Sequence, residues 1–192
     1  MEINNIEQLD LSKRYTYHDY FKWQFEDRVE LYNGKVYKIG PSPGTKHQRI
    51  SNELSYRITK HVSKLAYQVF CAPFDVRLER VKDDKNVINV VQPDICVICD
   101  LSKIDERGCS GAPELVVEIL SPGNNTREMN QKFDLYEAAG VLKYRIVDPE
   151  KEVVFQYFRE NNNFINYRPL TKEHTIKSRV VDGFEIELST IF

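Results

Sequence analysis

The chain lacks any long hydrophobic run. Nowhere in its 192 residues does an apolar stretch approach the roughly 20 residues that are needed to cross a bilayer. The first ten residues, MEINNIEQLD, also lack the basic and then apolar layout of a signal peptide. We therefore expect a protein that does not enter the membrane and stays in the cytoplasm.

Cysteine is scarce, with four residues at positions 71, 96, 99 and 109. Without a secretion signal they are more typical of free thiols than of a disulfide framework. Cys96 and Cys99 form a CxxC pair, but PDICVIC reads as a strand, and residues three apart in a strand point to opposite faces. No second CxxC completes a zinc site, so we interpret all four cysteines as small hydrophobic residues.

A strong charge of either sign is also missing. The net charge of −2 and the pI near 6.1 argue against a protein that coats nucleic acid, but they leave room for a local basic patch. The chain has no internal repeat, low-complexity stretch or long Pro/Gly/Ser linker. These absences predict a single domain over residues 1–192.

Hydrophobic periodicity predicts a mixed fold. Tyr15 to Phe25 is compatible with a short helix, and residues 28–39 predict a hairpin around Asn33-Gly34. Thr45 to Ala66 has helical periodicity, and a second helix, which Asn125 and Glu128 could cap, ends at Ala139 before a glycine. Further strands are predicted over residues 67–72, 74–79, 86–91, 94–99, 114–120, 143–148, 153–158 and 164–169. We expect an α/β or α+β fold with a mixed sheet flanked by helices.

The predicted helix over 45–66 has two distinct sides. Its apolar side includes His47, and its opposite flank carries a basic stripe of Lys46, Arg49, Arg57, Lys60 and Lys64. Such a stripe is most often a solvated outer face, and the alternative is a surface that follows nucleic-acid phosphates. A histidine on an apolar side is usually hydrogen-bonded in the core, and less often faces a site.

Two carboxylates on predicted strands are the candidate metal ligands. Asp94 opens one strand after Pro93, and Glu118 lies 24 residues later inside the apolar run ELVVEIL. That run is typical of a central strand covered on both sides, where an unpartnered carboxylate is costly to bury. If the two strands pair, both carboxylates meet, and a divalent cation would relieve their repulsion. Such a cation could also neutralise a phosphodiester and lower the pKa of an attacking water.

Structural interpretations compete with this one. Asp94 could simply accept main-chain hydrogen bonds at the start of its strand. Glu118 could belong to a buried ion pair, for example with Lys132. Glu30 lies in the predicted hairpin, where an exposed charge is normal. The four-residue spacing of Glu128, Lys132 and Tyr136 is also that of a helical salt bridge beside a packed tyrosine.

Several segments resemble a known family of nucleases. Pro93-Asp94 followed by Glu118 is similar to the PD-(D/E)xK nuclease pattern. The segments VVQPDICVI, GAPELVVEILSP and AAGVLKYRIVDP, with Lys132 and Tyr136 between the last two, resemble the Uma-two family of restriction endonucleases. The resemblance is strongest over residues 30–149, and it includes an E-x-x-x-G hairpin at Glu30 and a Pro-then-His segment that ends at His47.

This resemblance implies a restriction-endonuclease-like fold in which Asp94 and Glu118 bind Mg²⁺ or Mn²⁺. It implies that Glu30 is a further acidic residue near the metal. The usual pattern has a lysine where this chain has Leu120, and Lys132 on the following helix takes the place of that lysine. An ammonium group there could orient the water or stabilise charge on phosphorus. The chain departs from its relatives at Glu128, Lys143 and Arg145, where they show Asp, Glu and Trp.

The leading hypothesis is therefore a metal-dependent endonuclease that cleaves DNA, with Asp94 and Glu118 as metal ligands, Lys132 and Glu30 in support, and His47, Glu128 and Tyr136 as accessory residues. We expect a homodimer, because cutting both strands of a duplex is easiest with two sites. One alternative is a binding or regulatory module that keeps the fold without turnover. Another is hydrolysis of a different substrate by paired carboxylates, which for sugars needs no metal.

Overall fold

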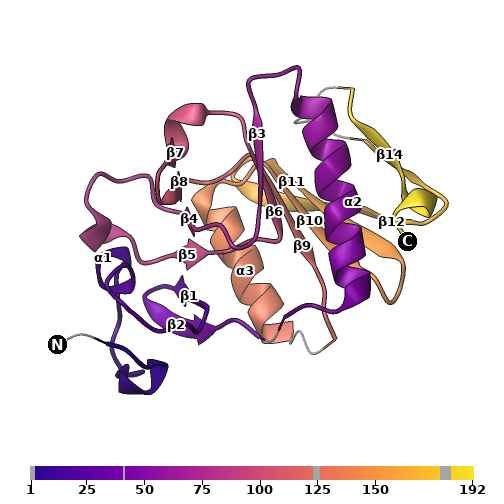
Figure 1. Ribbon diagram of the computed structural model, residues 1–192. Helices are drawn as coiled ribbons and strands as arrows, with labels where there is room; N and C mark the ends of the chain where they lie inside the picture. The colour runs from indigo at the N-terminus through magenta and orange to yellow at the C-terminus, as the bar shows by residue number, and fades with distance from the viewer. Residues whose placement is uncertain (1–2, 41, 123–125, 178–182) are drawn as a thin grey trace.

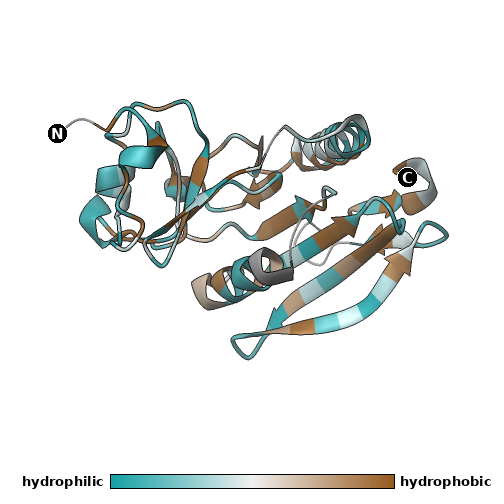
Figure 2. Cartoon of the chain, turned by 90° about the horizontal axis from the view of Figure 1, so that it is seen from below, coloured by the Kyte–Doolittle hydropathy of each residue, from teal (hydrophilic) through white to brown (hydrophobic). Residues whose placement is uncertain are grey.

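The computed structural model of the protein describes residues 3–40, 42–122, 126–177 and 183–192, without the side chains of residues 126–128. The fold has two six-stranded sheets, a two-stranded hairpin and two long helices, α2 (Thr45–Val62) and α3 (Thr126–Ala139). Figures 1 and 2 show these helices on opposite faces of the sheet that contains β9 and β10. The mixed fold with flanking helices agrees with the prediction from the sequence.

The central sheet has the strand order β12-β11-β10-β9-β6-β3. Strands β9 and β10 run parallel with α3 between them along the chain, whereas all other neighbours in this sheet are antiparallel. The strands are β3 (Gln68–Cys71), β6 (Ile95–Ile98), β9 (Leu115–Ile119), β10 (Lys143–Asp148), β11 (Val153–Glu160) and β12 (Asn163–Thr171).

Each face of this sheet has its own apolar core. On one face Ile50, Leu54 and Ile58 of α2 pack with Val117 of β9. On the other face Leu135 and other residues of α3 pack against Val116, Cys96 and their neighbours. The continuous apolar run of β9 is explained by this double coverage. Cys96 and Cys99 accordingly belong to opposite cores, as their spacing predicted.

The second sheet has the strand order β2-β1-β5-β4-β8-β7. Its strands are β1 (Val29–Tyr32), β2 (Lys35–Lys38), β4 (Val76–Arg77), β5 (Val90–Val91), β7 (Ile104–Asp105) and β8 (Gly108–Ser110). The predicted hairpin is confirmed, because Asn33 and Gly34 connect β1 and β2 with positive φ values of 51° and 76°. A side chain at Gly34 would meet Arg14 and Tyr15 atoms at 2.9 to 3.0 Å.

Several elements differ from the sequence-based expectations. Helix α1 covers only Tyr17–Tyr20, because the following aromatic residues turn back, and Trp23 packs edge-on against Tyr15 at 5.3 Å. Helix α2 ends at Val62 instead of continuing to Ala66. The hairpin of β13 (Thr175–Lys177) and β14 (Glu185–Glu187) was not predicted. The short 3₁₀ helices are η1 (Ile6–Gln8), η2 (Asp84–Asn86), η3 (Leu101–Lys103) and η4 (Leu188–Thr190).

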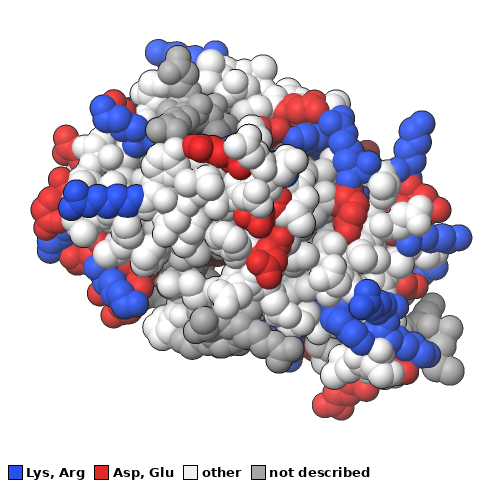
Figure 3. Space-filling model, turned by 180° about the vertical axis from the view of Figure 1, so that it is seen from behind, with Lys and Arg blue, Asp and Glu red and all other residues white. Residues whose placement is uncertain are grey.

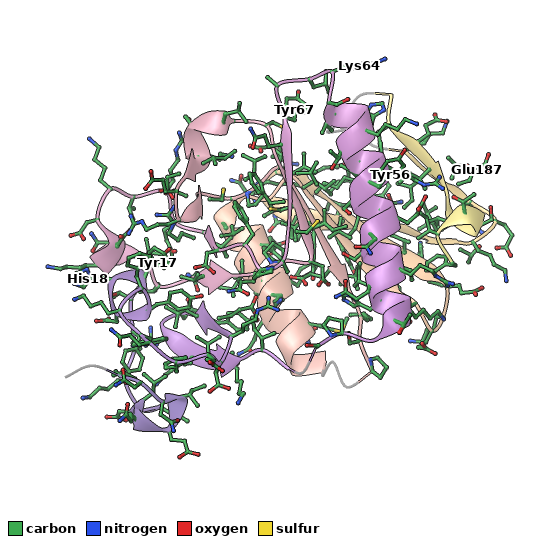
Figure 4. All side chains as sticks on the ribbon, viewed as in Figure 1. Tyr17, His18, Tyr56, Lys64, Tyr67 and Glu187 are labelled. Atoms are coloured by element: carbon green, nitrogen blue, oxygen red, sulfur yellow. The ribbon has the colours of Figure 1, made fainter. Side chains whose placement is uncertain are left out.

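The two ends of the molecule are built from different parts of the chain. Figure 4 shows Tyr17 and His18 on α1 at one end and Glu187, the last residue of β14, at the other. Between them, Tyr56 projects from the outer side of α2 and is 60 % exposed. Of the helices in the described parts of the chain, none combines the length and the apolar character that a membrane span requires.

Candidate active site

The two predicted carboxylates meet where β6 begins and β9 ends. These strands pair antiparallel, with Ile95 opposite Val117, so that Asp94 and Glu118 occupy the next position along the ladder. The main-chain N–H of Ile119 donates a hydrogen bond of 2.8 Å to Oδ2 of Asp94. Pairing of the two strands, which the sequence left as a condition, is thus present.

His47 holds the same oxygen of Asp94 from the other side. Its Nε2 lies 3.2 Å from Asp94 Oδ2, and its side chain is 7 % exposed. Burial lowers the pKa of His47, but the hydrogen bond and the charge of Asp94 outweigh burial and raise that pKa overall. Two donors thus fix Oδ2 of Asp94. Its Oδ1 makes no hydrogen bond with any residue that the structure describes.

Glu118 also accepts two hydrogen bonds at a single carboxylate oxygen, and both donors belong to α3. Lys132 Nζ lies 3.0 Å, and the Tyr136 hydroxyl 2.7 Å, from Oε1 of Glu118. Both donors come from α3, because residues four apart on a helix share one face. Within the described parts of the chain, Oε2 of Glu118 has no hydrogen-bond partner. Each carboxylate therefore has one oxygen held and one oxygen left for another ligand.

The surroundings of Glu118 disfavour its charged form. Burial raises the pKa of Glu118, the charge of Lys132 lowers it, and the carboxylates of Asp94 and Glu30 raise it; together these effects place the pKa at about 7. For Lys132, burial lowers the pKa, but the two glutamates beside it raise it well above its ordinary value. The lysine therefore stays charged, and the cluster holds more negative than positive groups.

Glu30 is buried rather than exposed, so the interpretation of a solvated hairpin charge is wrong. It is 3 % exposed, and it accepts a hydrogen bond from the main-chain N–H of Gln92 at 2.7 Å. The same oxygen lies 3.2 Å from Lys132 Nζ, and the other oxygen accepts from the Tyr32 hydroxyl. Glu30 thus connects the lysine to the segment that leads into Asp94.

Sequence reasoning did not identify two members of this network, Tyr32 and Gln92. A signal existed for Tyr32, because it lies two residues after Glu30 on β1, and a strand directs such residues to the same face. Gln92 contributes its main-chain N–H, which any residue except proline could supply at that position. The identity of the residue at position 92 therefore could not predict this contact.

The donor set suits a hard divalent cation. Glu30 and Glu118 both form ion pairs with Lys132, and Asp94 lies across the strand pair from Glu118. Asp94 and Glu118 each keep one oxygen without a hydrogen bond to the residues that the structure describes. In the parts of the chain that the structure describes, no group of three or more His, Cys, Asp or Glu side chains is placed to hold a metal ion by itself. Mg²⁺ commonly binds through one or two carboxylates, with water and substrate phosphate as its other ligands. Asp94 and Glu118 fit that arrangement.

The remaining predicted residues lie around or away from this cluster. The basic residues of α2 follow its outer side, where Lys46 lies 3.8 Å from Glu150 and Arg57 lies 2.5 Å from Glu53. Arg49 and Lys60, which belong to the same predicted contact set, are exposed. The side chain of Glu128, predicted as an accessory residue, lies outside the described residues.

Lys143 and Arg145, the two departures on β10, belong to the structural core rather than to the acidic cluster. Both side chains are buried, and both donate hydrogen bonds to the main-chain oxygen of Lys177, at 3.0 and 3.3 Å. Lys143 Nζ also lies 4.4 Å from the centre of the Phe158 ring. Burial lowers the pKa of Arg145 to about 9. These two residues support packing of the C-terminal hairpin.

Comparison with known proteins identifies the family of this chain. The profile of the Uma2 family, described as "Putative restriction endonuclease", matches residues 17–189. The chain belongs to the Uma2 family. An uncharacterized protein of Synechocystis is 26 % identical over 157 residues, which cover 78 % of each chain.

A solved structure supports the fold of this Uma2 protein. It is described as a putative nuclease belonging to DUF820 from Anabaena variabilis, and it superimposes with a TM-score of 0.68 at 21 % identity. The match covers 92 % of this chain and 97 % of that one. At this level of identity the similarity establishes the fold alone.

Proposed function

We propose that this Uma2 protein is an endonuclease that hydrolyses DNA phosphodiester bonds with the help of Mg²⁺ or Mn²⁺. The observation that carries the proposal is the pair of Asp94 and Glu118, each with one oxygen held by two donors and one without a hydrogen bond to any described residue. The membership of a family described as restriction endonucleases supports the same activity.

Each residue of the cluster has a distinct role in this proposal. Asp94 and Glu118 would hold the cation, which supplies charge neutralisation at the phosphate and a more acidic water. His47 and Tyr136 orient the two carboxylates through the hydrogen bonds at 3.2 and 2.7 Å. Lys132, as the ammonium group beside Glu118, would orient the attacking water or stabilise charge on phosphorus. Glu30 positions Lys132 rather than binding the metal, because both its oxygens already have partners.

One observation favours a second candidate, a nucleic-acid-binding module without turnover. Lys132 already forms ion pairs with Glu118 at 3.0 Å and Glu30 at 3.2 Å, so the lysine neutralises part of the acidic cluster without a cation. A buried ion pair of this kind can be purely structural. Measurement of metal binding separates the two candidates.

Removal of metal is expected to abolish cleavage. Purified protein should nick or linearise supercoiled plasmid in Mg²⁺ or Mn²⁺ and should leave it intact in EDTA. Saturating metal should also raise the melting temperature, because a ligand that binds only the folded state stabilises it. Cleavage that continues in EDTA would contradict the metal-dependent mechanism. Absence of both cleavage and a thermal shift would favour the non-catalytic module.

The outer side of α2 is the proposed DNA contact surface. The helix begins at the acidic cluster with His47, and it extends about 27 Å for its 18 residues. Its exposed basic residues could therefore follow the phosphate backbone away from the site. In the described parts of the chain, Arg49 and Lys60 form no ion pair, and Lys60 lies 5.9 Å from the centre of the exposed Tyr56 ring. A base could stack on such a ring.

Substitution of Arg49 or Lys60 by alanine is expected to weaken DNA binding several-fold at low salt. Each lost phosphate contact should reduce the slope of log affinity against log salt by about 1. Fluorescence anisotropy over a salt series measures both quantities. Lys82→Ala is the matched control, because Lys82 is exposed on a turn far along the chain from α2. Equal salt slopes for all three variants and the wild type would exclude α2 as the contact surface.

Cleavage of both strands of a duplex is easiest with two sites, one for each strand. The homodimer that the sequence suggested is part of this proposal, by analogy with other enzymes that cut duplex DNA.

A further inference from the structure

A cavity lies beside the acidic cluster, between the β1–β2 hairpin and α3. Its volume is about 560 Å³, and its wall includes Tyr32, Tyr37, Asn33, Asn89, Gln131 and Asp134. The volume falls within the range of small-molecule sites, and it exceeds what a single planar ring system needs. Figure 3 views the molecule from the α3 side, where acidic side chains gather near the middle of the face and basic ones lie mainly toward its edges.

The charges of the wall disfavour a phosphate or another anion as the ligand. Lys35 is the basic residue of the wall, and its ammonium group already donates to the main-chain oxygens of Leu11, Ser12 and Lys13 at 2.6 to 3.3 Å. Glu79 and Asp134 add two carboxylates. A ligand for this wall is therefore neutral or carries hydrogen-bond donors for the carboxylates.

The aromatic and amide groups of the wall suit a flat ring with polar edges. Tyr32 and Tyr37 stack with their ring centres 4.4 Å apart. In the part of the chain that the structure describes, Asp134 has no hydrogen bond or ion pair, so its oxygens can accept from a ligand. Gln131 donates its Nε2 to the Tyr37 hydroxyl at 2.9 Å and keeps its carbonyl oxygen as a second acceptor. Tyrosine rings and carboxylate or amide acceptors are the groups that read an unstacked base.

The cavity wall is connected to the proposed catalytic residues through a hydrogen bond and an ion pair. The Tyr32 hydroxyl donates to Glu30, which lies 3.2 Å from Lys132. Gln131 precedes Lys132 on α3. The cavity wall and the acidic cluster are therefore connected through Tyr32 and through adjacent residues of α3.

We propose that this cavity receives one unpaired nucleobase of the DNA, next to the phosphodiester that is cut. This inference rests on the proposed nuclease function and names its substrate class: DNA with an unpaired nucleotide, either single-stranded or bulged. Because the wall offers more acceptors than free donors, a base with an exocyclic amino group, such as adenine or cytosine, fits better than thymine. A base inside an intact duplex cannot reach the cavity without leaving the stack.

Binding of bulged DNA without metal tests this site apart from cleavage. We would measure the affinity of full-length protein in EDTA, by fluorescence anisotropy, for hairpin DNA with a single bulged adenine, a bulged thymine or a bulged abasic nucleotide. The abasic probe keeps the bend and the backbone, so it isolates the contribution of the base. The adenine bulge is expected to bind about tenfold more tightly than the abasic bulge, in keeping with the usual effect of base stacking. The thymine bulge should lie between them.

Three variants locate the effect in the cavity. Asp134→Ala and Tyr37→Leu should each remove most of the preference for the bulged base. Asn130→Ala should keep it, because Asn130 is exposed on the same helix and is not part of the wall. Asp134 is also exposed, so its substitution does not endanger folding.

The outcomes separate the two proposals. Equal binding of the adenine and abasic bulges, or a preference that survives both wall substitutions, would overturn the base site. If such a protein still cleaves plasmid with Mg²⁺, only the base site is lost and the nuclease stands. A base preference that depends on Asp134 and Tyr37, without cleavage in any metal, would support the site and contradict the nuclease function.

Discussion

Replacement of Glu118 by glutamine is expected to reduce metal-dependent plasmid cleavage by at least about a thousandfold, since a catalytic metal contributes several kcal/mol of transition-state stabilisation. Glutamine keeps the shape of the side chain and can still accept hydrogen bonds from Lys132 and Tyr136 through its carbonyl oxygen. It removes the negative charge that would attract the cation. The variant should therefore fold, and it should bind Mg²⁺ or Mn²⁺ weakly.

The measurement compares initial rates of plasmid nicking over a range of metal concentrations. Glu106→Gln is the matched control, because Glu106 is an exposed glutamate outside the cluster. Calorimetric titration with Mn²⁺ reports binding without any reaction. Undiminished cutting by Glu118→Gln, with the control active as well, would remove Glu118 from the mechanism.

The same substitution is expected to stabilise the metal-free protein at alkaline pH. The folded-state pKa of Glu118 is about 7, above the ordinary value of 4.5. Between these values the folded state binds more protons at this group than the unfolded state, so the free energy of unfolding falls as the pH rises. The full difference corresponds to roughly 3 kcal/mol, at about 1.4 kcal/mol per pH unit. Glutamine cannot ionise and avoids this loss.

Urea denaturation in EDTA at pH 5 and pH 8 measures the effect. Glu118→Gln should exceed the wild type by about 1 to 3 kcal/mol at pH 8 and differ little at pH 5, where Glu118 is mostly protonated when folded. Glu106→Gln again serves as the control, since that exposed side chain lies outside the acidic cluster. A variant that is less stable than the wild type at pH 8 would show that the ion pair with Lys132 outweighs the cost of burying the charge.

In these two predictions the same carboxylate lowers the stability of the metal-free protein and is required for cleavage. A buried carboxylate that destabilises the free protein when ionised is well suited to bind a cation, because the cation relieves the repulsion from Asp94 and Glu30. The gain in stability on loss of Glu118 and the loss of cleavage would then have the same electrostatic cause. A purely structural ion pair predicts neither result.

Local sequence signals predicted much of the fold. The Asn33-Gly34 turn specified the hairpin because few residues tolerate two successive positive φ values. The apolar run around Glu118 specified a strand covered on both sides. Short strands such as β4 and β5 were predicted too long, because their pairing ends where neighbouring strands end rather than where β-forming residues end.

The sequence by itself determined the acidic residues of the site, the strand and helix that carry Glu118 and Lys132, and the resemblance to Uma2 proteins. All of these depend on residue type and local periodicity. The tertiary structure alone decided that Glu30 is buried, that His47 reaches Asp94, and that Asp94 and Glu118 each keep one oxygen without a hydrogen bond to the described residues. These features depend on contacts between segments far apart in the chain, and burial, distance and pKa arise only when those segments pack together.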